Sequence, residues 1–296
     1  MEKRPDKYLY HILAVVVVSI WGTTFVSTKV LLSAGLSPVG IFAIRFAVAY
    51  AGIWLLPEAG GRRVWAHTWR DEALFAALGM TGGSLYFIAE NEALLYSQAS
   101  NVAFIVCSTP VLTMLMGAFQ HGGERLTRRM AVGTLLSLAG VALVVFNGSK
   151  VLRLNPAGDM LALAAAVLWA LYTLILRRLD HSYTVTMITR KTFFYGLVTL
   201  VPLLAVRPPV MEWAVLLQPK VVLNLLFLGV VASLLCYAAW SLIVKHLGST
   251  RTTNYLYINP VVATALSAAL LGERITLLAV AGAAMILTGI WLVEKR

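Results

Sequence analysis

The stretch NVAFIVCSTPVLTMLMGAFQHGGERLT, residues 101–127, decides the fold, because RTTNYLYINPVVATALSAALLGERIT, residues 251–276, repeats its pattern. Each copy has a proline, Pro110 or Pro260, in the middle of an apolar segment that ends in a Gly-Glu-Arg-x-Thr turn. The next apolar segment carries two glycines seven residues apart, which are Gly133 and Gly140 in one copy and Gly282 and Gly289 in the other. Since the two prolines are 150 residues apart, we expect two related halves.

The composition indicates a membrane protein. The chain has 296 residues, of which 59% are hydrophobic and only 12% are charged. A soluble domain has about 25% charged residues, so this chain has too few charges to cover a water-facing surface. The net charge of +11 is expected to follow the sides of a membrane rather than to bind nucleic acid. Both cysteines, Cys107 and Cys236, lie in apolar segments, which favours buried thiols over a disulfide.

Apolar runs of about 20 residues mark the membrane-spanning helices that we expect. The first run is expected to be retained as a helix, because no small-residue cleavage site follows it. The sequence predicts an all-α integral membrane protein with ten transmembrane helices in two halves, residues 1–147 and residues 148–296. The expected spans are 10–31, 38–57, 72–95, 100–120, 128–147, 157–177, 185–206, 221–245, 251–271 and 276–293. A short interfacial helix anchored by Trp213 is expected within residues 207–220.

Basic residues predict the orientation of these spans. With a cytoplasmic N-terminus, 17 Lys and Arg residues fall on the cytoplasmic side and 5 on the other, the bias that the positive-inside rule describes. The cytoplasmic set is Lys3, Arg4, Lys7, Arg62, Arg63, Arg70, Arg125, Arg128, Arg129, Arg177, Arg178, Arg190, Lys191, Lys245, Arg251, Lys295 and Arg296. The other set is Lys150, Arg153, Arg207, Lys220 and Arg274. We therefore expect both termini in the cytoplasm.

Five helices per half is an odd number, so the second half enters the membrane upside down and the repeat is inverted. The register extends beyond the best-matched segments: Trp21 pairs with Trp169 in the first helix of each half, and Gly79 pairs with Gly229 in the third. Inverted repeats are typical of secondary transporters whose binding site lies between the two copies.

These motifs resemble the drug/metabolite transporter superfamily, specifically its EamA-type members. The matching residues are Trp21-Gly22-Thr23, Ser37-Pro38, Arg45-Phe46, Ala99-Ser100-Asn101, Pro110, the Gly-Glu-Arg turn and the pair Gly133 and Gly140. The resemblance implies ten helices in two inverted five-helix repeats, a central cavity and alternating access. It also implies export or exchange of small metabolites, often amino acids, across the inner membrane if the source is bacterial.

The two prolines are candidate hinges. Each removes an amide donor and clashes with the carbonyl four residues earlier, at Val106 or Leu256. The exposed backbone polar groups are tolerable in a membrane only where protein or a wet cavity satisfies them. Two interpretations stand: Pro110 and Pro260 are hinges beside a cavity, or they are static kinks that improve packing.

Glu90 is the most informative ionisable residue. It shares a helix face with Tyr86, and an ionisable group inside a span costs roughly 2.5–3.5 kcal/mol on insertion scales, so it is expected to face a cavity or a partner. Arg45 lies at a similar depth and is the leading partner. The two form either a permanent ion pair, or a pair that breaks during transport. In the second case Arg45 would bind an anionic group, and Glu90 a cationic group or a coupling proton.

Aromatic and polar side chains recur at helical spacing on the corresponding helices. Such a lining suits a medium-sized, partly apolar solute, although lipid-facing aromatic residues would give a similar pattern. Together with Arg45, Tyr86 and Glu90, the predicted substrate-binding residues are Trp21, Thr24, Trp169, Tyr172, Tyr237, Trp240, Asn254 and Tyr257.

The two Gly-Glu-Arg turns are expected to be structural. Glu124 and Glu273 are interpreted as turn residues, and Thr127 and Thr276 as caps of the helices that follow. The glycine pairs should permit close backbone approach, either within the chain or in a dimer, so a monomer and a homodimer both remain open.

The sequence has no His-Glu-x-x-His, Gly-x-x-x-x-Gly-Lys or Gly-x-Ser-x-Gly motif, and its five histidines have no ligand spacing. We therefore expect no enzyme activity, no cofactor and no metal site. The main hypothesis is a secondary transporter, most plausibly an exporter, whose partners are a small-molecule solute and membrane lipid. The alternative is a membrane receptor or sensor that binds a small metabolite without moving it.

Overall fold

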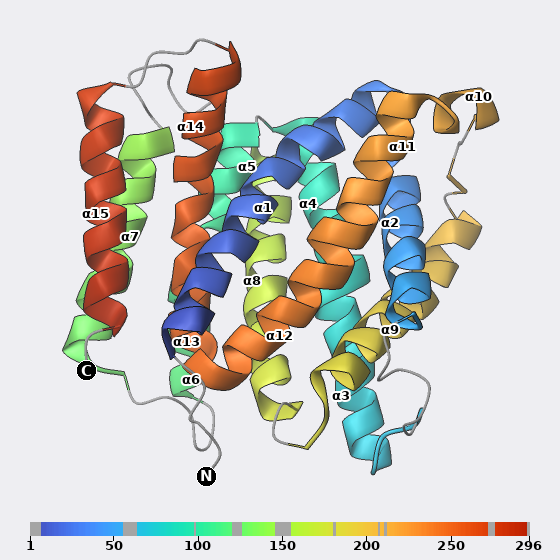
Figure 1. Cartoon of the computed structure of the whole chain (residues 1–296), viewed down its shortest axis with the longest axis horizontal. Helices are drawn as coiled ribbons and strands as arrows, with labels where there is room; N and C mark the ends of the chain where they lie inside the picture. The colour runs from blue at the N-terminus through green and yellow to red at the C-terminus, as the bar shows by residue number, and fades with distance from the viewer. Residues whose placement is uncertain are drawn as a thin grey trace.

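The computed structural model describes residues 7–55, 64–97, 99–119, 126–145, 155–179, 182–206, 208–209, 212–271 and 276–294. Within these residues the regular structure is entirely helical, and the helices form one bundle (Figure 1). Both Gly-Glu-Arg turns, residues 123–125 and 272–274, lie outside the described residues, and so do Glu124 and Glu273.

The first half of the chain supplies eight of the described helical segments. Each falls on or within a few residues of a range that the sequence predicts as a span. In chain order they are α1 (Lys7–Ser33), α2 (Pro38–Ile53), α3 (Trp69–Gly79), the π-helical segment η1 (Met80–Ser84), α4 (Leu85–Tyr96), α5 (Ala99–Val106), α6 (Thr109–Ala118) and α7 (Arg128–Val145).

The second half follows the same order and adds a short helix before its third span. That helix is α10 (Trp213–Leu216), where the sequence predicts a short interfacial helix, and Trp213 is exposed. The other elements are α8 (Pro156–Leu179), α9 (Val185–Val206), α11 (Pro219–Leu226), the π-helical segment η2 (Phe227–Leu235), α12 (Cys236–Leu247), α13 (Ser249–Asn254), the 3₁₀ segment η3 (Tyr255–Tyr257), α14 (Ile258–Leu271) and α15 (Leu277–Glu294).

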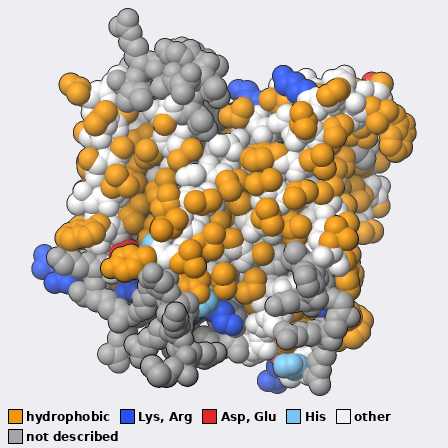
Figure 2. All heavy atoms as spheres, in the orientation of Figure 1, with side chains coloured by type: hydrophobic (Ala, Val, Ile, Leu, Met, Phe, Trp, Pro, Cys, Tyr) orange, Lys and Arg blue, Asp and Glu red, His pale blue; other side chains and the backbone are white. Residues whose placement is uncertain are grey.

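The surface of the bundle fits a lipid surrounding. Among the described residues, eight helices are long and apolar enough to cross a membrane, and α2 is apolar but shorter. Figure 2 shows hydrophobic side chains across the broad middle of one face, with Lys and Arg side chains toward its upper and lower edges. Large apolar side chains such as Leu9, Val201 and Trp291 are more than half exposed, which water would disfavour and hydrocarbon would not.

Helix starts follow local sequence signals. The Ser37 side chain accepts a hydrogen bond from the Gly40 N–H, and Pro38 occupies the first turn of α2, where its missing donor costs nothing. Thr127 accepts from the Met130 N–H at the start of α7. Thr276 accepts from the Ala279 N–H at the start of α15. The predicted capping role of these two threonines is thus confirmed.

The bundle has two ends that are used below as landmarks. The terminal face holds the start of α1 and the end of α15, since His11 Nδ1 lies 3.9 Å from Glu294 Oε2. The distal face is the opposite end, where α1 finishes at Ser33 and α2 begins at Pro38 (Figure 1).

The helices that carry the paired glycines, α7 and α15, lie side by side at one edge of the bundle (Figure 1). A Cβ added at Gly133 would lie 2.5 Å from the Gly289 carbonyl oxygen, and one added at Gly140 would lie 2.5 Å from that of Gly282. The two helices are therefore antiparallel, and their backbones meet at the glycines as the sequence predicts. These glycine faces pack against each other within one chain.

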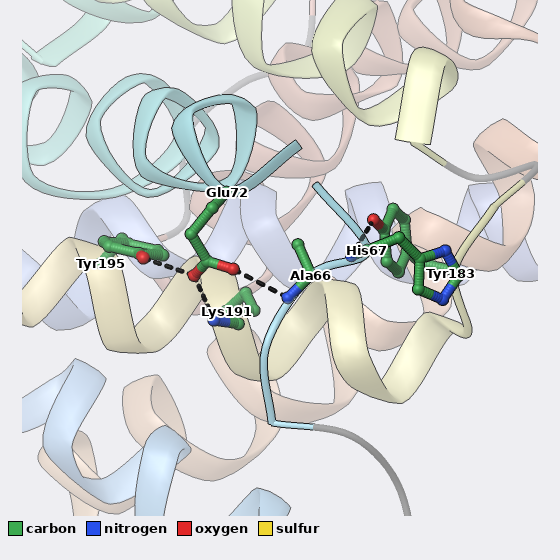
Figure 3. A network of polar contacts seen from close by, with 6 residues as sticks. All are labelled: Ala66, His67, Glu72, Tyr183, Lys191 and Tyr195. Atoms are coloured by element: carbon green, nitrogen blue, oxygen red, sulfur yellow. Dashed lines mark hydrogen bonds and ion pairs between the residues drawn. The ribbon is translucent and has the colours of Figure 1, made fainter. Parts of the chain in front are cut away.

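A polar network joins the loop before α3 to α9 near the terminal face (Figure 3). The Glu72 carboxylate accepts hydrogen bonds from Lys191 and Tyr195 of α9, and from the Ala66 backbone N–H at 2.8 Å. Because Lys191 is almost fully buried, Glu72 supplies the counter-charge that its burial requires. The network thus fixes α3 against α9 at this end.

Tyr183, in the turn before α9, extends this network. Its hydroxyl donates to Asp71 Oδ2 at 2.8 Å and accepts from the His67 N–H at 2.8 Å. Burial raises the pKa of the Tyr183 phenol, and the Asp71 carboxylate raises it further, while the His67 N–H acts in the opposite direction. The phenol therefore stays a hydrogen-bond donor well into the alkaline range.

Candidate solute-binding cavity

A cavity of about 710 Å³, counted with its mouth, lies between helices of both halves. Along the spans of the first half, the lining residues lie near the middle or toward the distal face. In the second half, Trp169, Tyr237 and Leu256 lie slightly past the middle of their spans, toward the terminal face. The lining residues are Trp21, Thr24, Phe25, Arg45, Tyr86, Phe87, Glu90, Ala103, Val106, Cys107, Trp169, Tyr237, Leu256, Asn259 and Pro260.

Arg45 supplies the positive charge of the cavity. Its side chain is only 4% exposed, and its Nε donates to Ser233 Oγ at 2.5 Å. The guanidinium carbon lies 4.2 Å from the centre of the Phe87 ring, within cation–π range. Ser233 and Phe87 are neutral, so they hold the guanidinium in place without neutralising it. Its two terminal nitrogens have no hydrogen bond to any described residue.

Glu90 supplies the negative charge. It is 9% exposed, and its Oε1 accepts a hydrogen bond from the Tyr86 hydroxyl, one turn earlier on α4, at 2.6 Å. Among the ion pairs between described residues, none joins Arg45 to Glu90 within 4.0 Å. The expectation of a permanent direct ion pair is therefore wrong for this structure: each charge has a neutral partner of its own, and both line the same cavity.

Aromatic rings from both halves meet at the floor of the cavity. Trp21 and Trp169, which correspond in the sequence repeat, lie edge to face with ring centroids 5.2 Å apart. Tyr237 lies 6.1 Å from Trp21 and 5.8 Å from Trp169. Offset and edge-to-face contacts of this kind add to the burial energy of each ring, so the floor is a packed aromatic layer.

Seven of the predicted substrate-binding residues line this one cavity. They are Trp21, Thr24, Arg45, Tyr86, Glu90, Trp169 and Tyr237. They come from α1, α2, α4, α8 and α12, which the chain brings together from residues more than 200 positions apart.

The other four predicted residues, Tyr172, Trp240, Asn254 and Tyr257, do not line the cavity. Each of these four residues is at most 1% exposed. Tyr172 and Trp240 lie one turn from the lining residues Trp169 and Tyr237, on the side of the terminal face. The Asn254 Oδ1 accepts from Thr134, and its Nδ2 donates to the Thr250 carbonyl. These four side chains therefore belong to the packed interior of the bundle.

Both predicted hinge prolines coincide with helix breaks. The helix before Pro110 ends at Val106, and α6 starts at Thr109, whose hydroxyl donates to the freed Val106 carbonyl at 2.7 Å. Pro260 follows the 3₁₀ segment η3, and it lines the cavity itself. The Val106 carbonyl is thus freed at the position that the proline geometry dictates, whereas the Leu256 carbonyl accepts from the Ile258 N–H at the end of η3.

Several lining residues were not among the predicted site residues. Phe25 directly follows Thr24, and Phe87 directly follows Tyr86. Their positions next to predicted site residues could have indicated that they line the cavity. Asn259 Oδ1 is buried without a partner among the described residues, and its place before Pro260 was the available signal. Cys107 occupies the repeat position of Tyr257, and its thiol points at the Leu256 carbonyl, 4.0 Å away.

Comparison with known proteins agrees with this architecture. The profile of the EamA-like transporter family matches the chain twice, at residues 8–146 and 156–294. A solved crystal structure shares the fold with a TM-score of 0.76 and 21% sequence identity, and the match covers 98% of this chain and 96% of that one.

Relatives with descriptive names point to export. A protein of Streptantibioticus cattleyicolor named "Probable terminal-alkyne amino-acid exporter" is 27% identical over 95% of this chain and 92% of its own length. One of Escherichia coli named "Probable amino-acid metabolite efflux pump" is 27% identical over 95% of this chain and 93% of its own length. A protein of Archaeoglobus fulgidus named only as an uncharacterized transporter is 26% identical over 96% of this chain.

Fold and cavity together define a multi-pass integral membrane transporter for a small-molecule solute. The chain belongs to the EamA-like transporter family, within the drug/metabolite transporter superfamily.

Proposed function

We propose that this protein exports amino acids or closely related zwitterionic metabolites by alternating access through the cavity between its two halves. The observation that carries the proposal is the pair of opposite charges, Arg45 and Glu90, which line one aromatic cavity without bonding each other. A zwitterion presents a carboxylate to the guanidinium and an ammonium to the carboxylate, so it satisfies both buried charges at once. The printed names of two relatives agree with this solute class.

The proposed architecture is ten membrane helices in two inverted five-helix repeats, residues 1–147 and 148–296. The contact between α7 and α15 supports it. In the sequence repeat Gly133 corresponds to Gly282 and Gly140 to Gly289, whereas in space Gly133 meets Gly289 and Gly140 meets Gly282. Exchanging the two halves therefore turns each contact into the other. Antiparallel helices with this property are related by a two-fold axis across them, which is the symmetry of an inverted repeat.

The terminal face is proposed to face the cytoplasm, with the protein in the inner membrane if its source is bacterial. The bias of Lys and Arg toward that side supports this orientation. In this orientation the lining residues of α1, α4 and α5 lie in the half of their spans that is away from the cytoplasm. On that basis the structure is proposed to be an outward-facing state. The use of the glycine faces of α7 and α15 within one chain favours a monomer over a homodimer that would use the same faces.

The motion is proposed to bend the helices that are broken near Pro110 and Pro260. Both breaks lie beside the cavity, with Val106 and Cys107 next to one and Leu256 and Pro260 at the other. Hinges occur where a few element-terminal residues absorb the backbone change. Bending at both breaks would close the distal half and open the terminal half around the same solute.

Proton coupling is proposed to act through Glu90. A proton on its carboxyl group would remove the negative charge that holds the ammonium group of the solute, so protonation and solute binding would exclude each other. We expect Glu90→Gln to abolish the dependence of the exchange rate on an imposed pH gradient while leaving the protein folded. Exchange by Glu90→Gln that keeps the wild-type pH dependence would rule out this residue as the coupling site.

Efflux from proteoliposomes tests the function directly. Vesicles would be loaded with a mixture of amino acids, nucleobases and small organic acids, and the lost solutes would be identified by mass spectrometry, with and without a pH gradient. We expect selective loss of zwitterionic solutes, and much slower loss with Arg45→Ala. Empty liposomes correct for leakage. Absence of selective loss from protein shown to be folded, under both gradient conditions, would contradict transport and favour a receptor.

A further inference from the structure

The two π-helical segments occupy corresponding places in the two halves. The repeat pairs Gly79 with Gly229, so η1 (Met80–Ser84) corresponds to residues 230–234, which lie inside η2 (Phe227–Leu235). A π-helical turn leaves a backbone carbonyl without its usual amide donor, and such turns are frequent at functional sites. Gly83, with φ −130° and ψ −108°, marks the irregularity in η1.

One carbonyl in each π-helical segment accepts a hydrogen bond from an aromatic side chain at the cavity floor. The Ala232 carbonyl accepts from Trp21 Nε1 at 2.9 Å. The Gly82 carbonyl accepts from the Tyr237 hydroxyl at 2.5 Å. With an offset of 150 residues, Gly82 and Ala232 are the same position of the repeat, so the two acceptors are equivalent.

The two donors, in contrast, are not equivalent. Trp21 corresponds to Trp169, and the helix of Trp169, α8, packs on η1 as α1 packs on η2. By the repeat, Trp169 Nε1 should donate to Gly82. Instead Trp169 Nε1 is buried without a hydrogen-bond partner among the described residues. The acceptor that the repeat assigns to it is already bonded to Tyr237.

This arrangement leaves the structure poised between two hydrogen-bond patterns. Leaving a buried indole N–H unpaired is unfavourable, so Trp169 would gain by reaching an acceptor. Its ring lies 5.8 Å from that of Tyr237, centroid to centroid, so the competing donors are neighbours. The repeat position of Tyr237 is Phe87, which has no donor, so the repeat supplies no counterpart of Tyr237 to compete for Ala232.

We propose that the Gly82 carbonyl is the acceptor of a hydrogen-bond switch that sets which half of the bundle is open. Tyr237 holds it in the state described here, while Trp21 holds Ala232. In the opposite state Tyr237 releases Gly82, Trp169 Nε1 binds it, and Trp21 releases Ala232. Trp169, Tyr237 and Trp21 are thus positioning residues for the conformational step. The switch rests on the proposed function, because it assumes that the two halves exchange conformations during transport.

Tyr172 keeps the contact between α8 and η1 close enough for this exchange. A Cβ added at Gly82 would lie 2.2 Å from Tyr172 Cδ2, so the ring rests directly on the glycine backbone. Tyr172 and Trp169 are neighbours on α8, with ring centroids 4.9 Å apart. The contact of Tyr172 with Gly82 therefore holds the helix of Trp169 against the segment that carries the shared acceptor.

Accessibility of single cysteines, measured without solute, tests the switch. Cys107 and Cys236 would be replaced by Ala, and a reporter placed either at Phe25→Cys, which lines the cavity, or at Thr253→Cys, which is buried in the terminal half. Alkylation rates with a small maleimide give the ratio of terminal-side to distal-side accessibility. Tyr237→Phe, which frees Gly82, and Trp169→Phe, which removes the second donor, then change one hydrogen-bonding group each.

The two substitutions should act in opposite directions. We expect Tyr237→Phe to raise the terminal-to-distal ratio about tenfold and Trp169→Phe to lower it by a similar factor, the size of one hydrogen bond to a buried acceptor. Trp21→Phe should move the ratio in the same direction as Tyr237→Phe. Shifts of Tyr237→Phe and Trp169→Phe in the same direction, or no shift in one or both folded variants, would overturn the switch.

Efflux by the wild type, measured in parallel, separates this result from the proposed function. Efflux with unshifted accessibility ratios would contradict the switch alone. No efflux, with a wild-type reporter at Thr253 that is never alkylated, would contradict alternating access itself. Size-exclusion profiles and melting temperatures of all variants establish that only folded protein is compared.

Discussion

Two of the contacts between the halves of this protein differ in symmetry: the one at the edge of the bundle is symmetric, and the one at its centre is not. Along α7 and α15, Gly133 meets Gly289 and Gly140 meets Gly282 in matching contacts. At the cavity floor, Trp21 is bonded to a carbonyl of the other half, whereas its counterpart Trp169 is not. The same repeat thus produces a regular contact at the edge of the bundle and an irregular one at its centre.

The difference follows from what makes each contact. Backbone meets backbone between α7 and α15, and no rotamer change can relieve or rearrange such a contact. At the cavity floor, side chains donate hydrogen bonds to backbone carbonyls. One side-chain donor can replace another there while the helices keep their packing. We infer that the edge of the bundle serves as a fixed seam and the centre as the moving part.

The largest effect is expected from breaking the seam. Gly140→Leu would force a side chain into the Gly282 carbonyl and the Ile286 backbone, none of which can move aside. We expect a loss of stability of about 3 kcal/mol or more, seen as aggregated or poorly melting protein in detergent. Gly117→Ala is the matched control, because its Cβ would meet only Leu174 Cδ2 at 3.4 Å. Equal stability of the two variants would contradict a fixed seam.

The second-largest effect is expected when a charge is removed from the cavity. Arg45→Ala leaves the seam intact but takes away the group that binds the solute carboxylate, so efflux should fall by about 30-fold or more. Arg45→Lys should restore little, since an ammonium cannot reproduce the planar fork held by Ser233 and Phe87. Lys29→Ala, at an exposed position of α1, is the control. An efflux rate that Arg45→Ala leaves unchanged would show that the solute does not bind at Arg45.

A smaller effect is expected at the helix breaks. Pro110→Ala and Pro260→Ala would let each helix recover a hydrogen bond and stiffen, so transport should slow severalfold while the melting temperature stays the same or rises. Stopped-flow exchange of the solute identified by mass spectrometry would measure the rate. Unchanged rates in both variants would favour the static-kink interpretation.

The smallest effect concerns the network near the terminal face, away from the cavity. Tyr183→Phe removes the hydrogen bond to Asp71 and the one from the His67 N–H, and it should cost about 1 kcal/mol or more of stability at neutral pH, with no change in efflux. Because the folded pKa of Tyr183 is raised, its stabilising contribution is complete below the unfolded value of about 10 and declines above it. Melting temperatures from pH 8 to pH 11 should therefore converge for wild type and Tyr183→Phe. Parallel curves would contradict the assigned bond.

The sequence predicted the parts of this structure that depend on pattern. Apolar runs located the helices, Pro110 and Pro260 located the breaks, and the paired glycines predicted a close backbone contact. Arg45 and Glu90 could be singled out because charged side chains are rare inside membrane spans and usually face a cavity or a partner.

The parts that depend on conformation could not be predicted from pattern. Trp240 and Tyr257 have the spacing of cavity residues, yet they are fully buried away from the cavity, because helical spacing does not specify how neighbouring helices pack against a given face. The π-helical segments contain no proline that would predict a helix irregularity. Gly82 and Gly83 are the sequence feature that could have indicated the one in η1. The bond between Glu72 and Lys191 joins residues 119 positions apart, a distance over which helical periodicity carries no information.

One measurement connects the cavity to transport most directly. In the cysteine-free background, Phe25→Cys would be alkylated from outside the vesicle in the presence of increasing concentrations of the solute that the wild type exports. The account predicts that this solute slows the alkylation, and that Arg45→Ala abolishes the protection. Alkylation that stays at its unprotected rate while the same protein exports the solute would contradict a binding site in this cavity.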